Sequence, residues 1–85
     1  MTKTITVRYF ASIREAMGTG EETWATTAPT VAALRQELAG RSAQAALALA
    51  EDQPVRLALN QTMCPPDASI ASGDEVAFFP PVTGG

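Results

Sequence analysis

The sequence predicts a single α+β domain in which a mixed β-sheet packs on one main helix. Three observations support this fold class. The chain has 85 residues, enough for one modest hydrophobic core. Apolar and polar residues alternate in several short runs, which is typical of strands with one buried face. One segment, from residue 30 to residue 40, instead carries apolar residues at helical spacing.

The first strand is predicted over residues 4–10, where three apolar side chains fall on one face: Ile5, Val7 and Tyr9. A second strand is expected over residues 21–27, because threonine and tryptophan suit a pleated surface. Gly18 and Gly20 precede this second run. We therefore expect the two strands to pair as a hairpin.

Helix signals occur in three places. The motif 12-SIRE-15 has the form of a capping box and predicts a short helical turn that stops at Gly18. The main helix should begin after Thr30 and end at Gly40, with Val31, Leu34 and Leu38 on its buried stripe. The alanine-rich segment 43–50 favours a second short helix.

The remaining runs predict the other strands. Residues 55–60 alternate clearly, with Val55, Leu57 and Leu59 inward and Arg56, Ala58 and Asn60 outward. Asn60-Gln61 suits a tight turn, after which residues 62–64 can pair back until Pro65-Pro66 ends the ladder. The last strand is expected over residues 75–79, with Val76 and Phe78 on one face and Phe79 on the other. This order of elements is a β-grasp arrangement.

Composition excludes several classes of protein. Basic residues occur singly and the net charge is −3, which argues against nucleic acid as a partner and favours a basic protein surface. No apolar run is long enough for a membrane span, and the first residues lack the apolar stretch of a signal peptide. We therefore expect a cytoplasmic protein with no membrane partner.

The residues offer little catalytic chemistry. There is no histidine, which excludes Ser-His and Cys-His nucleophilic pairs and any histidine-ligated metal site. The single cysteine, Cys64, cannot form an internal disulfide and is expected to be a half-buried small residue. Three adjacent acidic pairs are interpreted as solvated loop charges: Glu21-Glu22, Glu51-Asp52 and Asp74-Glu75. No metal site is predicted.

Two aromatic residues fall on the strand faces opposite the predicted core, namely Phe10 and Phe79. If the first and last strands are neighbours, these rings form one exposed apolar patch, with Met63 on the nearby short strand. Patches of this kind on small domains often bind a partner. The alternative is that the short helical turn or a loop covers the two rings.

The last six residues read as an extended tail (residues 80–85) that follows a β-grasp domain of residues 1–79. Pro80 and Pro81 end the strand and stiffen the chain. Gly84 and Gly85 have no side chains and could carry a terminal carboxylate through a narrow channel. A carboxylate is a poor acyl donor until it is activated, so any reaction there needs an ATP-dependent partner. The alternative is an ordinary frayed terminus.

Four segments together resemble the small, sulfur-carrier subunits of molybdopterin synthase. They are 9-YFASIRE-15, 29-PTVAALRQEL-38, 59-LNQT-62 and, most specifically, 73-GDEVAFFPPVTGG-85. The resemblance runs nearly end to end and implies a ubiquitin-like β-grasp fold.

The resemblance also implies a function. A ubiquitin-activating-type adenylyltransferase would use ATP to adenylate Gly85, which then becomes a thiocarboxylate. The carrier would dock on the large synthase subunit in a heterotetramer and donate sulfur to cyclic pyranopterin monophosphate, forming the molybdopterin dithiolene. The inserted tail would be Pro80, Pro81, Val82, Thr83, Gly84 and Gly85, and the docking residues Phe10, Met63 and Phe79.

On this interpretation the chain is a non-catalytic carrier subunit of an enzyme complex and binds no cofactor itself. Three alternatives remain open from the sequence. The chain could carry sulfur in the thiamine pathway, could be a ubiquitin-like modifier conjugated to lysines, or could be a β-grasp binding module with an unreactive tail.

Overall fold

The structure is a computed structural model that describes residues 2–81. The elements of this part run β1 (Lys3–Tyr9), α1 (Ala11–Met17), β2 (Glu21–Thr26), α2 (Val31–Ala39), α3 (Ala43–Leu49), β3 (Arg56–Leu59), β4 (Thr62–Met63) and β5 (Glu75–Phe79). Its strands form one sheet in the order β2-β1-β5-β3-β4. The central strands β1 and β5 are parallel, and the other neighbours are antiparallel. The predicted mixed sheet is confirmed.

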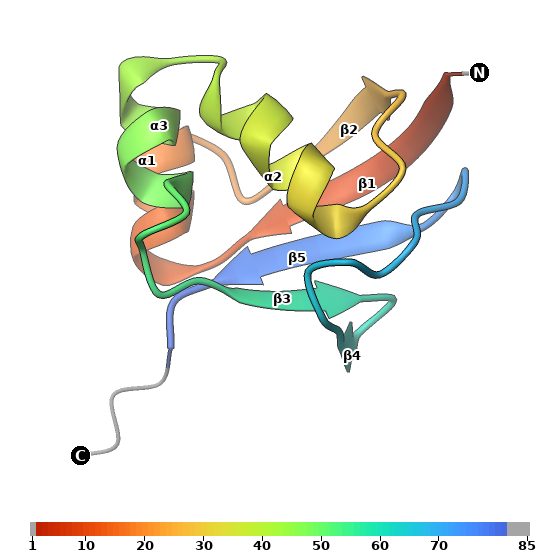
Figure 1. The fold of residues 1–85 in the computed structure, drawn as a ribbon. Helices are drawn as coiled ribbons and strands as arrows, with labels where there is room; N and C mark the ends of the chain where they lie inside the picture. Colours follow the sequence, from red (N-terminus) through yellow and green to blue (C-terminus); the bar gives the residue numbers. More distant parts are fainter. Residues whose placement is uncertain (1, 82–85) are drawn as a thin grey trace.

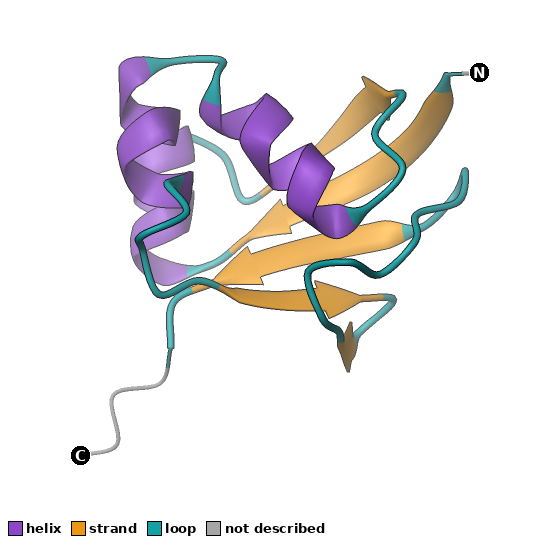
Figure 2. Cartoon of the chain, in the orientation of Figure 1, coloured by secondary structure: helices purple, strands orange, loops and turns teal. Residues whose placement is uncertain are grey.

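All three helices lie on the same face of the sheet and leave its other face uncovered (Figures 1 and 2). The main helix α2 crosses the strands, while α1 and α3 stand together at the end where β5 finishes. The prediction of one main helix with short additional helices is therefore confirmed. One layer of helices on one sheet gives the domain a single core between them.

The core forms where the alternation predicted it. Ile5, Val7 and Tyr9 of β1 are buried under the helices, and the Tyr9 ring stacks on Phe78 with the ring centroids 6.2 Å apart. The helical stripe Val31, Leu34 and Leu38 is fully buried against them. Each large apolar side chain removed from water in this way contributes about 1.5–3 kcal/mol. Burial of this layer is the main force that holds the helices on the sheet.

The ends of α2 agree with the sequence prediction. The Thr30 hydroxyl accepts a hydrogen bond from the Ala33 N–H (3.2 Å), and Gly40 is the residue that follows the last turn. The helix α3 has an equivalent cap, in which the Ser42 hydroxyl accepts a hydrogen bond from the Ala45 N–H (3.0 Å). This cap was not predicted from the sequence. Both helices are fixed at their first turn by side-chain caps.

The predicted capping box at 12-SIRE-15 is wrong. The helix α1 begins two residues earlier than Ser12 as N-cap would require: its N-cap is Phe10, and no side chain caps it. The Phe10 N–H donates to the Phe78 carbonyl, so the chain is still paired with β5 when the helix starts. The turn is made at Ala11, with φ of 52°, which leaves Ser12 inside the first turn. The predicted stop at Gly18 is confirmed, with φ of 79°.

Candidate docking face and tail

The neighbouring residues Phe78 and Phe79 point to opposite sides of the sheet. Phe78 is fully buried on the helical side, whereas Phe79 is half-buried on the uncovered side. β5 ends at Phe79, and Pro80 and Pro81 follow it directly. Proline has no N–H to donate, so the ladder cannot continue through this pair. The last ring of β5 therefore stands at the origin of the tail.

The structure brings Phe10 and Phe79 together, as the alternation predicted. Their ring centroids are 6.0 Å apart with the planes at 90°, an edge-to-face pair. The Arg8 guanidinium carbon lies 5.2 Å from the centroid of the Phe10 ring. Phe10 is 39% exposed despite these contacts. The alternative in which a helical turn or loop covers the rings does not apply to Phe10.

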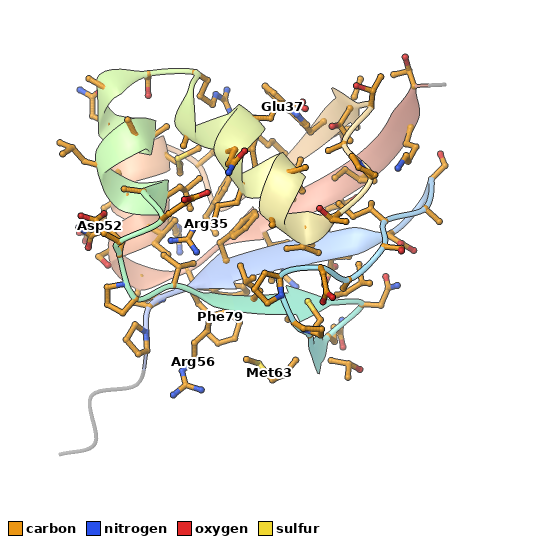
Figure 3. The ribbon with its side chains drawn as sticks, viewed as in Figure 1. Arg35, Glu37, Asp52, Arg56, Met63 and Phe79 are labelled. Carbon is orange, nitrogen blue, oxygen red and sulfur yellow. The ribbon has the colours of Figure 1, made fainter. Side chains whose placement is uncertain are left out.

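Met63 lies on the same uncovered face, two strands away from β5. It is 55% exposed and pairs with Ala58 of β3. Figure 3 shows Met63, Phe79 and Arg56 on the side of the sheet away from the helices. We use the name docking face for the surface formed by Phe10, Met63 and Phe79 together with the residues between them.

The floor of the docking face is formed by two alanines. Ala58 and Ala77 are directly opposite each other on β3 and β5 and share the outward direction of Phe79. Both are buried although they point away from the helices. Because alanine side chains are short, the centre of the docking face lies lower than the larger side chains around it. Alternation alone identified their direction but could not show that longer side chains would cover them.

The tail is only partly within the described chain. Pro80 and Pro81 are half-buried, whereas Val82, Thr83, Gly84 and Gly85 lie outside the described residues. The two prolines line a hollow of about 420 Å³ together with residues of α1 and α3, including Ile13 and the 75% exposed Leu47. No sequence pattern predicted this hollow. It is completed by residues 53–55, and it forms only when the fold brings α1, the stretch 44–55 and the tail prolines together.

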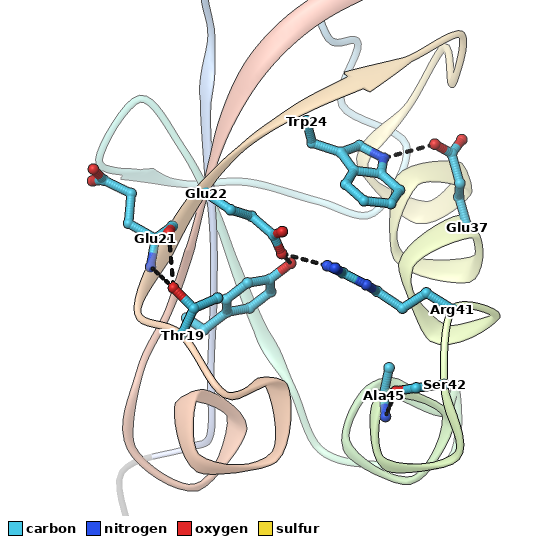
Figure 4. Close-up of polar contacts among 9 residues, drawn as sticks. Thr19, Glu21, Glu22, Trp24, Glu37, Arg41, Ser42 and Ala45 are labelled. Carbon is cyan, nitrogen blue, oxygen red and sulfur yellow. Dashed lines mark hydrogen bonds and ion pairs between the residues drawn. The ribbon is translucent and has the colours of Figure 1, made fainter.

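A polar network lies on the helical side of the sheet, towards its β2 edge, between β1, β2 and the segment that follows α2 (Figure 4). Glu22 accepts hydrogen bonds from the Tyr9 hydroxyl (2.6 Å) and from the Arg41 guanidinium. Burial, followed by the hydrogen bond to Glu22, raises the pKa of Tyr9 above its usual range. Arg41 also lies over the Trp24 ring, 4.8 Å from its centroid.

Hydrogen bonds correct the interpretation of one acid in each of two acidic pairs, Glu22 and Asp74. Glu22 is not a solvated loop charge, because it lies on β2 and joins two elements. Asp74 is also structural: its carboxylate accepts from the Ala71 N–H (2.8 Å) and from the Asn60 side-chain amide (3.1 Å). Both acids therefore join separate segments of the fold.

Two further expectations from the sequence concern Cys64 and metal ligands. Cys64 is half-buried as expected, and burial raises the pKa of its thiol, which makes it a weaker nucleophile. Across residues 2–81 there is no group of three or more His, Cys, Asp or Glu side chains that could hold a metal ion. None of the helices within that range is long and apolar enough to cross a membrane.

The arrangement so far is a β-grasp domain with an aromatic face on one side of its last strand. The chain matches the model of the ThiS family over residues 7–85. The chain belongs to the ThiS family. A curated relative, the "Molybdopterin synthase sulfur carrier subunit" of Escherichia coli (strain K12), is 52% identical over 81 residues, covering 95% of this chain and 99% of the relative. The family resemblance predicted from the sequence is confirmed.

Solved structures of chains of similar length share the fold of this chain. The solution structure of the Haloferax volcanii HVO 2177 protein has a TM-score of 0.83 and 29% identity, covering 99% of this chain and 88% of that one. A complex of subunits 1 and 2 of molybdopterin-converting factor from Helicobacter pylori 26695 contains a chain with a TM-score of 0.62 and 26% identity, covering 96% and 99% of the two chains. The ubiquitin-like β-grasp prediction is thus confirmed.

Proposed function

We propose that this ThiS-family chain is a sulfur carrier in molybdenum cofactor biosynthesis, with Gly85 as the carrying residue. The observation that carries the proposal is the 52% identity to a curated sulfur carrier subunit of molybdopterin synthase, which spans nearly all of both chains. That name also favours molybdopterin over thiamine as the destination. The family model alone does not separate the two.

The geometry of the described residues suits a carrier. An enzyme that modifies the last residue of a chain must bind the domain tightly and must also reach that residue. The docking face and the start of the tail adjoin each other, because Phe79 belongs to the face and Pro80 is the next residue. A partner that covers Phe10 and Phe79 therefore lies at the point where the tail begins. Pro80 and Pro81 then direct the chain away from the sheet.

The proposed chemistry takes place in two partners. A ubiquitin-activating-type adenylyltransferase joins AMP from ATP to the Gly85 carboxylate and releases pyrophosphate. A sulfur nucleophile then displaces AMP and leaves a thiocarboxylate. In the large synthase subunit this sulfur passes to cyclic pyranopterin monophosphate, towards the molybdopterin dithiolene, and water supplies the oxygen that replaces sulfur when the Gly85 carboxylate is regenerated. The chain itself supplies the acyl group and the docking contacts and binds no cofactor.

Partner assembly is supported by the H. pylori complex of subunits 1 and 2, in which a chain of this fold forms part of a two-subunit assembly. By analogy, the large subunit would cover Phe10, Met63 and Phe79 and receive residues 80–85. Two small and two large subunits would then form the heterotetramer.

Mass spectrometry tests the proposal directly. The chain is incubated with the adenylyltransferase, ATP and a sulfur source, and the intact mass should then show sulfur in place of one oxygen at Gly85. A variant that lacks Gly84 and Gly85 is the matched control. Its core is complete, since all the clustered core side chains lie at or before Phe78, so its thermal midpoint should equal that of the wild type. An unchanged mass of the wild-type chain, or full activity of the truncated variant, contradicts the proposal.

A further inference from the structure

Two arginines lie on the docking face, and their surroundings differ. Arg8 is on β1 and contacts acids on both sides: its Nε lies 3.5 Å from Glu21 and its guanidinium 4.0 Å from Glu75. Arg56 is on β3 and is exposed. In the part of the chain that the structure describes, Arg56 forms no ion pair with an acidic side chain. Among residues 2–81, Arg8 therefore has acidic partners and Arg56 has none.

The position of Arg56 is fixed by the strand register. Arg56 is directly opposite Phe79 in the β3–β5 pair, so the two side chains leave the sheet on the same face. Phe79 is followed by the tail prolines, which places Arg56 beside the origin of the tail. Figure 3 shows Arg56 pointing away from the helices next to Phe79.

A partner that covers Phe79 must also approach Arg56. Covering an arginine that has no counter-charge takes a charged group out of water without compensation, which is costly. A guanidinium matches a carboxylate well, because it can donate two parallel hydrogen bonds to it. An acidic side chain on the partner is therefore the group that Arg56 fits best.

We infer that Arg56 determines docking specificity by pairing with a carboxylate of the large synthase subunit beside the tail entrance. The inference rests on the proposed function, because it assumes that the large subunit covers the docking face. The chain has a net charge of −3 and suits a partner that is basic overall. One acid opposite Arg56 in an otherwise basic surface gives the complex a single orientation, since any other placement leaves Arg56 against positive charge.

The test measures the Kd for the purified large subunit at two salt concentrations. Replacing Arg56 with glutamine (R56Q) should weaken binding about fivefold to tenfold at an ionic strength of about 0.1 M, where charges interact over about 10 Å. The difference should fall below about twofold at about 1 M salt, where screening is nearly complete. Lysine (R56K) keeps the charge and loses the paired donors, so its Kd should lie between those of the wild type and R56Q.

A matched control changes the net charge equally at a distant site. Ala46 is exposed on α3, on the helical side of the sheet, and A46E also makes the chain more negative by one charge. A46E should bind within about twofold of the wild type at both salt concentrations, as expected for a charge outside the contact. An R56Q affinity equal to that of the wild type at low salt overturns the inference. So does an equal loss in A46E, because the effect would then come from net charge alone.

The same samples separate this inference from the proposed function. If the wild-type chain accepts sulfur at Gly85 and binds the large subunit, the proposed function stands, and the R56Q affinity decides the inference by itself. If the wild-type chain fails in either respect, the proposed function fails, and with it the partner that the inference requires.

Discussion

Phe78 and Phe79 allow one substitution to be made on each side of the sheet, one residue apart. We expect F78A to destabilise the domain strongly and F79A to impair mainly partner binding. Phe78 is fully buried and stacks on Tyr9. Phe79 is half-buried and pairs edge-to-face with Phe10 on the docking face. Because the two changes delete the same atoms, any difference between the variants comes from their surroundings.

The structure gives the two expected magnitudes. Truncating a fully buried phenylalanine costs about 3–5 kcal/mol. A domain of 85 residues has a free energy of unfolding of about 4–13 kcal/mol, at about 0.05–0.15 kcal/mol per residue. F78A therefore removes a large share of the total. F79A loses an aromatic pair worth about 0.5–1.5 kcal/mol and some buried area, so its free energy of unfolding should fall by about 1–2 kcal/mol.

Urea unfolding followed by Trp24 fluorescence measures the stability, and calorimetric titration with the large synthase subunit measures the binding. F79A should bind at least about tenfold more weakly, which corresponds to an interface residue worth about 1.4 kcal/mol or more. The folded fraction of F78A should bind nearly as the wild type does. If F79A loses as much stability as F78A, the Phe79 ring belongs to the core. If F79A binds normally, the docking face is wrongly placed.

Three other changes test the supports of the fold. Burial raises the pKa of Tyr9, so the wild type should lose stability as the pH rises above about 10, where the unfolded tyrosine loses its proton and the folded one keeps it. Above about pH 10 the decline for Y9F should be shallower than that of the wild type, by up to about 1.4 kcal/mol per pH unit, as measured by urea unfolding at pH 9–12. An unchanged slope contradicts the assignment. E37A removes the carboxylate that accepts a hydrogen bond from the Trp24 indole N–H (2.7 Å). It should lower the free energy of unfolding by about 1 kcal/mol and shift the tryptophan emission. An unaltered spectrum means that the bond is not formed in solution. Gly73 has a φ of 91°, which alanine adopts only with strain, so G73A should lower the thermal midpoint. Gly40 has a helical φ, so G40A should raise the midpoint slightly or leave it unchanged. Equal effects of the two substitutions refute this backbone argument.

Much of the fold was predictable because its signals are local. The run Ile5, Val7 and Tyr9 alternates with period two, and burial of one face of a strand requires that period. The turn at Asn60-Gln61 was likewise predictable, because asparagine tolerates positive φ and both residues adopt it, at 51° and 68°. In these places the local preference and the packed structure agree.

The failures occurred where distant parts of the chain decide the outcome. The capping box at Ser12 satisfied a local pattern, but the pairing of Phe10 with β5 set the start of α1 two residues earlier. Glu22 looked like a loop charge because its partner Arg41 is 19 positions away. The same limit applies to the docking face. Alternation identified Phe10, Met63 and Phe79. That Arg8 has acidic partners and Arg56 has none within residues 2–81 emerged only when the strands were placed together.

One register accounts for both the stability and the docking face. Tyr9 pairs with Phe78 in the parallel β1–β5 ladder, and this pairing buries both rings under the helices. The next residues, Phe10 and Phe79, then leave on the opposite face, where their rings meet at 6.0 Å. Since side chains alternate with period two, a slip of one residue would move the core rings into water and the docking rings into the core. The packing that stabilises the domain therefore also keeps the docking face assembled at the start of the tail.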